Sequence, residues 1–240
     1  MKFRTLLLLP ILVILWIAAP AGAQTVTVTG SVEVTKSASQ KTAPGSADVA
    51  VWLAPVGEAP VSHPKRKFTL VQKNKTFEPH MLVVPAGSEV DFPNKDPFFH
   101  NVFSLFDGKR FDLGLYEAGT SKSLRFDRPG ISFLFCNIHP EMSAVVIALE
   151  TPYYGVSNRA GRVSISDVPP GKYVLHVWRE GSSPEALKAL SRQVVVSSDS
   201  SSLGKLAVPD NATLPIAHKN KYGRDYENTT PGGTGYTPPR

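Results

Sequence analysis

The chain has 240 residues and a formal net charge of +6, and its 26 basic residues are scattered rather than gathered into dense runs. This distribution argues against a nucleic-acid-binding protein, which normally carries a concentrated basic face. A chain of this length can bury one or two hydrophobic cores. It must do so without an internal disulfide, because it contains a single cysteine.

Residues 1–23 have the features of a secretory signal. Two basic residues precede a long apolar run, which ends at the small-residue sequence AGA before Gln24. A membrane anchor is the competing interpretation, because the run approaches the length of a spanning helix, but the cleavage site and the absence of a flanking stop signal favour cleavage. The sequence therefore predicts a periplasmic or secreted protein of net charge +4, with no stable membrane insertion once the signal is removed.

Alternating apolar and polar residues dominate the rest of the chain, and helical periodicity is nearly absent. Four segments read as half-buried strands: 25–34, 47–56, 162–168 and 173–178. The 21 prolines and 18 glycines separate such segments at short intervals. This pattern predicts an all-β sandwich or barrel. One short helix is expected over 183–192, where Ser183 can cap it and Pro184 can occupy its first position.

The central stretch, residues 66–150, reads as a unit of its own. It contains several apolar strands separated by the turns PAG (85–87) and RPG (128–130), and it holds the cysteine. The last part of the chain, residues 210–240, is polar and rich in Pro, Gly and Thr, and it predicts a flexible tail.

The cysteine carries the clearest chemical signal. Cys136, His139 and Met142 form a C-x2-H-x2-M loop, and His100 lies on an earlier strand. A thiolate, two imidazoles and a thioether suit copper in both of its common oxidation states, because sulfur favours Cu(I) and imidazole accepts either state. An unpaired cysteine in an exported protein also needs such an explanation, because an oxidising compartment attacks a free thiol. We therefore predict one mononuclear copper site formed by His100, Cys136, His139 and Met142.

Other residues near these four have two open interpretations. Asn101 and Asn137 directly follow two of the candidate ligands and could tie the loops around the thiolate, but asparagine is equally ordinary in turns. The remaining histidines have no partner at ligand spacing, and we expect them to be ordinary surface or core residues: His63, His80, His176 and His218.

The segment from about residue 77 to 149 resembles the cupredoxins, in particular plastocyanin-like and amicyanin-like blue copper proteins. The resemblance is carried by FEP (77–79), VVPAGSEVDFPNKD (83–96), HNV (100–102), RPG and CNIHPEM (136–142). It implies a Greek-key β-sandwich holding a type 1 copper on the four residues named above. It also implies that His139 passes the electron through an apolar surface patch, for which Phe98, Phe99 and Pro140 are candidates. The whole chain resembles exported bacterial proteins loosely named methylamine utilisation proteins.

A second resemblance covers GRVSISDVPPGKYVLHVWREG (161–181), which is similar to a motif of carboxypeptidase regulatory-like, transthyretin-like sandwiches. Such domains begin with a strand pair similar to segments 26–34 and 47–56, which here precede the copper unit. We therefore expect a smaller, discontinuous accessory sandwich from residues 24–62 and 151–208, with the cupredoxin-like unit at 66–150 inserted. The alternative is two consecutive units.

These features favour an exported one-electron carrier that is not an enzyme and whose redox partner is an unidentified protein. Copper storage or delivery is an alternative, although the chain lacks the Met-rich and His-rich tracts that would favour it. A structural or carbohydrate-binding sandwich is another. Copper oxidases and reductases are disfavoured, because they need further histidine clusters for additional metal ions.

Overall fold

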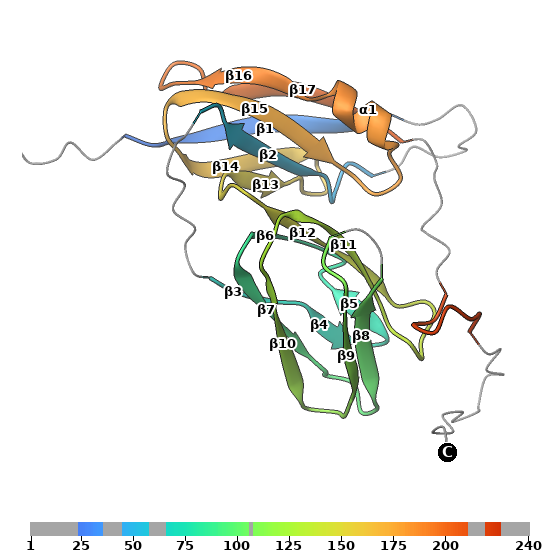
Figure 1. Ribbon diagram of the computed structural model, residues 1–240. Helices are drawn as coiled ribbons and strands as arrows, with labels where there is room; N and C mark the ends of the chain where they lie inside the picture. Colours follow the sequence, from blue (N-terminus) through green and yellow to red (C-terminus); the bar gives the residue numbers. More distant parts are fainter. Residues whose placement is uncertain (1–23, 36–44, 58–65, 106–107, 211–218, 227–240) are drawn as a thin grey trace, which may run out of the picture.

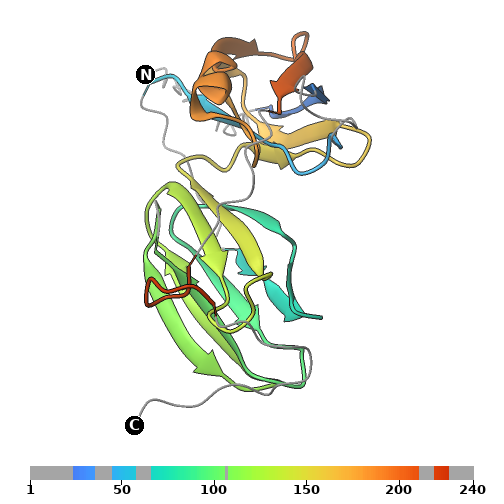
Figure 2. The same ribbon diagram turned by 90° about the vertical axis from the view of Figure 1, so that its right-hand side faces the viewer.

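The computed structural model describes residues 24–35, 45–57, 66–105, 108–210 and 219–226 (Figure 1). Nearly all of its regular structure is β-strand, which confirms the all-β fold class. The strands form two units stacked on one another, a central sandwich and a second sandwich (Figures 1 and 2). The predicted signal at 1–23 lies outside the described residues. Within the described part of the chain, no helix has the length and apolarity that crossing a bilayer requires.

The central sandwich is formed by two sheets and a small hairpin. One sheet has the strand order β6-β12-β11-β8-β9, the sheet packed against it has the order β10-β7-β3, and β4 pairs with β5. Side chains from both sheets meet in one buried cluster that includes Cys136 and Met142. The strands have these bounds: β3 (Lys67–Thr69), β4 (Val71–Lys73), β5 (Thr76–Glu78), β6 (Met81–Pro85), β7 (Ser88–Pro93), β8 (His100–Ser104), β9 (Phe111–Tyr116), β10 (Ser121–Phe126), β11 (Gly130–Phe135) and β12 (Ser143–Leu149).

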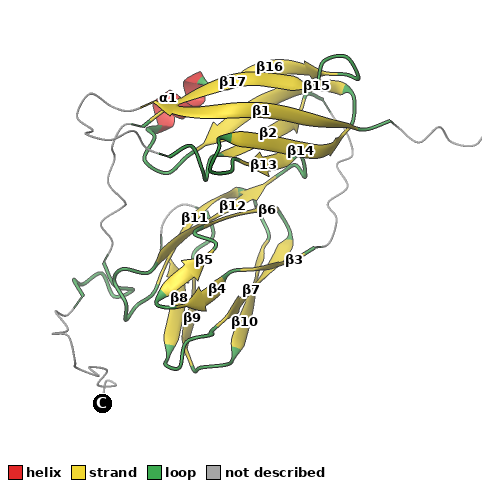
Figure 3. Ribbon diagram, turned by 180° about the vertical axis from the view of Figure 1, so that it is seen from behind, coloured by secondary structure: helices red, strands yellow, loops and turns green. Residues whose placement is uncertain are grey.

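The second sandwich combines strands from before and after the central one (Figure 3). Its sheets have the orders β14-β1-β17 and β13-β2-β15-β16. β1 pairs with both β14 and β17, so a strand that precedes the central sandwich in the chain lies between two strands that follow it. The bounds are β1 (Val26–Thr35), β2 (Ala50–Pro55), β13 (Tyr154–Val156), β14 (Arg162–Val168), β15 (Gly171–Trp178), β16 (Arg192–Val196) and β17 (Ser202–Pro209).

The short helix α1 (Pro184–Ala189) lies in the second sandwich and begins where the sequence predicts. Ser183 has extended backbone angles and its Oγ accepts a hydrogen bond from the Ala186 N–H at 3.2 Å, so the predicted cap is confirmed. Pro184 occupies the first turn, where its missing N–H costs nothing.

Strand β12 is buried on both faces and joins the two sandwiches. Its even-numbered residues pack inside the central sandwich, whereas Val145, Ile147 and Leu149 belong to the core of the second sandwich. Met81 and Val83 of the neighbouring strand β6 pack in the same direction as these odd-numbered residues. The outer face of β6 and β12 is therefore covered by the second sandwich.

Strand register places the candidate ligands at one end of the central sandwich. β11 and β12 stay paired up to Phe135 and Ser143, so the loop between them emerges directly at this sheet end. Phe103 of β8 pairs with Phe135 in antiparallel fashion. Continuing this register brings His100, at the start of β8, beside the same loop.

Candidate metal centre

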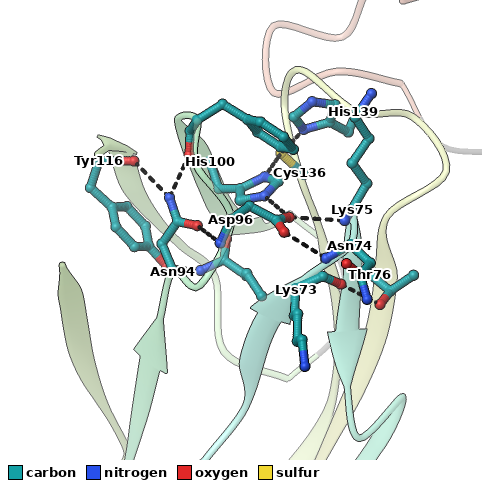
Figure 4. A network of polar contacts seen from close by, with 12 residues as sticks. Lys73, Asn74, Lys75, Thr76, Asn94, Asp96, His100, Tyr116, Cys136 and His139 are labelled. Carbon is teal, nitrogen blue, oxygen red and sulfur yellow. Dashed lines mark hydrogen bonds and ion pairs between the residues drawn. The ribbon is translucent and has the colours of Figure 1, made fainter. Parts of the chain in front are cut away.

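Three candidate ligands have their donor atoms close together. The Sγ of Cys136 lies 3.8 Å from His100 Nδ1 and 3.6 Å from His139 Nδ1. All three donor atoms are within 4.8 Å of one another (Figure 4). His100 and Cys136 are fully buried, and His139 is half-buried at the surface end of the loop.

These distances agree with a shared transition-metal ion. Protein sites hold such an ion at about 2.3 Å from a thiolate sulfur and about 2.0 Å from an imidazole nitrogen. A trigonal arrangement of these bonds separates sulfur and nitrogen by about 3.7 Å. The two sulfur–nitrogen distances in the structure lie within 0.1 Å of this value. The donor set therefore fits the predicted copper.

Met142 closes the loop that carries two of the ligands. Its N–H donates to the His139 carbonyl at 3.1 Å, and its carbonyl accepts from the Cys136 N–H at 3.3 Å. The side chain is fully buried in the same cluster as Cys136. Its role as a fourth ligand stays a prediction.

Asp96 fixes the orientation of the His100 ring. His100 Nε2 donates to Asp96 Oδ2 at 2.8 Å, and both side chains are buried. The proton on Nε2 leaves Nδ1 with its lone pair free to face Cys136. A carboxylate on the outer nitrogen of a metal-binding histidine is a recurring arrangement in metal sites, because it selects the tautomer and raises the basicity of the ligand.

Asp96 is itself held by the turn between β4 and β5. The N–H groups of Asn74 and Lys75 donate to its two oxygens at 2.6 and 2.9 Å, and both residues have positive φ angles near 55°. Burial opposes ionisation of Asp96, but hydrogen bonds from Lys75, His100 and Asn74 hold its pKa below the usual value. The carboxylate is therefore charged at neutral pH. Asp96 is not among the residues that the sequence predicts for the site; its one sequence signal is a carboxylate four residues before the first candidate ligand.

The sulfur of Cys136 faces three backbone donors. Burial raises the pKa of the Cys136 thiol, and hydrogen bonds from the N–H groups of Ile138, Asn101 and His139 oppose that increase. The thiol of the metal-free chain is therefore protonated at neutral pH. A bound cation would supply the positive charge that a buried thiolate needs.

His139 is neutral at physiological pH, as a metal ligand must be. Burial lowers its pKa to about 4, and the positive charge of Lys75 acts in the same direction. The Phe98 ring lies 5.5 Å from the His139 ring and 5.2 Å from the His100 ring, so it packs against both imidazoles. Phe99 points outward with 54% of its surface exposed, and Pro140 is also exposed.

The two asparagines predicted to tie the loops together have different contacts. Asn101 contributes its backbone N–H to the sulfur, while its side-chain Nδ2 donates to Asp112 on β9 at 2.7 Å. Asn137 Oδ1 accepts from the Lys221 N–H at 2.9 Å. Lys221 lies in the predicted flexible tail, of which residues 219–226 are described and contact the ligand loop.

The other histidines are away from the cluster or outside the described ranges. His80 pairs with Glu180 at 2.6 Å, and His176 stacks on Trp52 with ring centroids 5.2 Å apart. His63 and His218 lie outside the described residues.

Comparison with known proteins gives likenesses for part of the chain. No family model matches the sequence, and no curated protein matches it. Among solved structures, a copper-containing nitrite reductase from Thermus scotoductus SA-01 is 23% identical at a TM-score of 0.34, over 40% of this chain. The matched region spans only 25% of that reductase.

Two smaller copper proteins are similar in the same way. A purple cupredoxin from Nitrosopumilus maritimus is 21% identical at a TM-score of 0.32, covering 34% of this chain and 99% of its own. A Cu(I) form of an amicyanin variant is 21% identical at a TM-score of 0.33, covering 35% of this chain and 82% of its own.

Proposed function

We propose that the chain is an exported type 1 copper protein that carries single electrons between partner proteins. The observation that carries this proposal is the convergence of His100 Nδ1, Cys136 Sγ and His139 Nδ1 at one buried end of the central sandwich. Met142 is proposed as the weak fourth ligand from the same loop. Bound copper would supply a one-electron couple at this position.

The residues around the cluster suit such a couple because they hold the donors before any metal arrives. Asp96 fixes the His100 ring, and three backbone N–H groups fix the Cys136 sulfur. Donor atoms that do not move when the charge changes keep the reorganisation small, which is the requirement for rapid electron transfer. His139 is the half-buried member of the set, and we propose its ring edge, beside Phe98, as the route to a redox partner.

We propose a carrier rather than an enzyme. Within the described residues, one group of histidine, cysteine and acidic side chains lies close enough to hold a metal ion. A copper reductase or oxidase would require a further cluster. The proposed location, periplasmic or secreted, rests on the predicted signal at residues 1–23.

Absorption spectroscopy of the copper-loaded protein tests the proposal. An intense thiolate-to-copper band in the visible region is expected, and it should vanish in Cys136→Ser. Reversible reduction by a small electron donor should then bleach and restore the band. A colourless copper complex, or a coloured one that cannot be reversibly reduced, would contradict electron transfer. Copper storage or delivery would then be the better proposal.

A further inference from the structure

Residues 219–226 form a compact segment that lies beside the central sandwich, drawn in red in Figures 1 and 2. We call this segment the C-terminal strap. It is a turn closed on itself: Asn220 N–H donates to the Arg224 carbonyl, and the Gly223 N–H donates to the Asn220 carbonyl, both at 2.9 Å. The Asn220 side chain also accepts from the N–H groups of Tyr222 and Arg224. The strap therefore has a defined shape.

The strap bonds to the first two residues of the ligand loop. The Tyr226 hydroxyl donates to the Cys136 carbonyl at 2.8 Å. The Lys221 N–H donates to Asn137 Oδ1 at 2.9 Å. Lys221 and Tyr226 are half-buried, whereas residues 222–225 between them are exposed. The strap thus turns its two contacting ends toward the loop and its middle toward solvent.

A second connection leads from the strap toward the Cys136 sulfur through β9 and β8. Lys221 Nζ pairs with Asp112 Oδ2 at 2.8 Å, and Asp112 Oδ1 accepts from Asn101 Nδ2 at 2.7 Å. Asn101 is the residue whose backbone N–H points at Cys136 Sγ. The Lys221 side chain of this pair is 20% exposed and that of Asp112 is 37% exposed. Two series of contacts therefore lead from the strap to Cys136. One ends at its carbonyl oxygen, and the other passes through Asp112 of β9 and Asn101 of β8 to its sulfur.

We propose that the C-terminal strap is a structural part of the metal centre, in which Tyr226 and Lys221 are positioning residues that hold Cys136 and close its loop. The strap restricts opening of the loop, and so limits access of small reagents to the thiol and escape of a bound metal ion. Where it concerns copper, this inference rests on the proposed function; where it concerns the thiol, it does not.

The thiol of the metal-free protein gives the first test. Cys136 is the only cysteine, so a chromogenic aromatic disulfide reports on this residue alone. In the exchange the Cys136 thiolate attacks the reagent, a mixed disulfide forms, and one coloured aromatic thiolate leaves. Tyr226→Phe removes one hydrogen bond from the closed loop, and we expect the reaction to become about fivefold faster. Lys221→Ala should act in the same direction, and the double variant more strongly.

Tyr154→Phe is the matched control. It removes a phenolic hydroxyl from a half-buried tyrosine of the second sandwich, distant from the ligand loop in the fold. Its thiol reactivity should equal that of the parent chain. Equal reactivity of parent, Tyr226→Phe and Lys221→Ala would overturn the proposal.

Truncation separates the strap from the residues that follow it. A chain ending at residue 226 keeps every strap contact described above and should react like the parent. A chain ending at residue 218 should react at least as fast as the double variant. If both truncated chains react alike, the strap has no role in closing the loop.

The rate of copper release gives a second test, whose outcome is independent of the thiol reaction. In copper-loaded protein, Tyr226→Phe should release copper to a Cu(I) chelator several-fold faster than Tyr154→Phe. If the parent protein gives no thiolate-to-copper band, the proposed function fails, and the metal-free thiol reaction still decides the strap. If the band forms and release rates are equal, the strap does not retain the metal and this proposal is wrong.

Discussion

The imidazole of His100 donates from Nε2 to the Asp96 carboxylate at 2.8 Å, deep in the end of the central sandwich where Cys136 also lies. This contact makes Asp96 part of the candidate metal centre, although we do not propose it as a metal ligand. Without the carboxylate, nothing in the described contacts fixes the tautomer of His100. The orientation of one proposed ligand therefore depends on a side chain from the loop before β8.

Asp96→Asn tests this dependence. The amide retains an oxygen acceptor but loses the charge that stabilises the Nε2–H tautomer. We expect copper affinity to fall about 10-fold to 100-fold, as for other partners of metal-binding histidines. Competition with a chelator of known affinity measures it. Asp127→Asn, which changes a carboxylate exposed on the same sandwich, should leave the affinity unchanged.

Met142→Leu tests the proposed fourth ligand. Leucine has nearly the same volume, so the fully buried site should tolerate it at a cost below about 1.5 kcal/mol. If the thioether donates to copper, its loss should destabilise Cu(II) relative to Cu(I) and raise the reduction potential. Potentiometric titration with spectral detection measures the shift. An unchanged potential and spectrum would show that Met142 is only a core residue.

The pair of His80 and Glu180 predicts a pH dependence of stability. His80 Nε2 lies 2.6 Å from the Glu180 carboxylate, and its Nδ1 donates to the Ser143 carbonyl at 3.1 Å. The hydrogen bond to Glu180 is the main cause of the raised pKa of His80, and burial opposes it. Because the folded pKa exceeds the unfolded value of 6.5, the stabilisation is complete below pH 6.5 and is lost as the pH rises through the folded value.

Glu180→Gln should therefore lower the free energy of unfolding at pH 6 and have little effect on it at pH 9. The side chains are 45% and 30% exposed, so the difference should be about 0.5 kcal/mol. Thermal unfolding of both proteins at pH 6 and pH 9 measures it. A difference that is equal at the two pH values would contradict protonation of His80 in the pair.

Ile147→Ala tests the shared core between the two sandwiches. Ile147 is 1% exposed on the face of β12 that packs against the second sandwich. We expect a loss of about 2–5 kcal/mol in unfolding free energy. Val195→Ala, at a position that is 61% exposed, should change stability by less than about 0.5 kcal/mol.

Two probes show whether both sandwiches lose stability in Ile147→Ala. Trp52 and Trp178, which lie in the second sandwich, report by fluorescence, and reactivity of Cys136 reports on the central one. Both transitions should move together in Ile147→Ala. Separate shifts would mean that the two sandwiches unfold independently.

The sequence predicted the features that depend on local pattern. Alternation revealed the strands and hence the all-β class, and the Ser183–Pro184 pair marked the start of the helix. The C-x2-H-x2-M spacing identified two donors that the structure brings together, and the strand pattern identified His100 as the third. Each of these patterns lies within a short segment of the chain, although His100 itself is 36 residues from Cys136.

The features that the sequence did not predict depend on contacts between distant segments. Asp96 acquires its role from the N–H groups of Asn74 and Lys75, which become available only because their turn has positive φ angles. The polar composition of residues 210–240 predicts a flexible tail, whereas residues 219–226 form the C-terminal strap. Composition does not show that Lys221 and Tyr226 find partners on the ligand loop.

The two-sided burial of β12 means that the central sandwich is not a self-sufficient domain. If residues 66–150 were expressed without their flanks, a contiguous hydrophobic patch would be exposed to solvent. It would consist of Met81, Val83, Val145, Ile147 and Leu149. Such a fragment should aggregate or dimerise. Replacing the central sandwich would therefore require compensating substitutions in the second sandwich, which covers this face of β12.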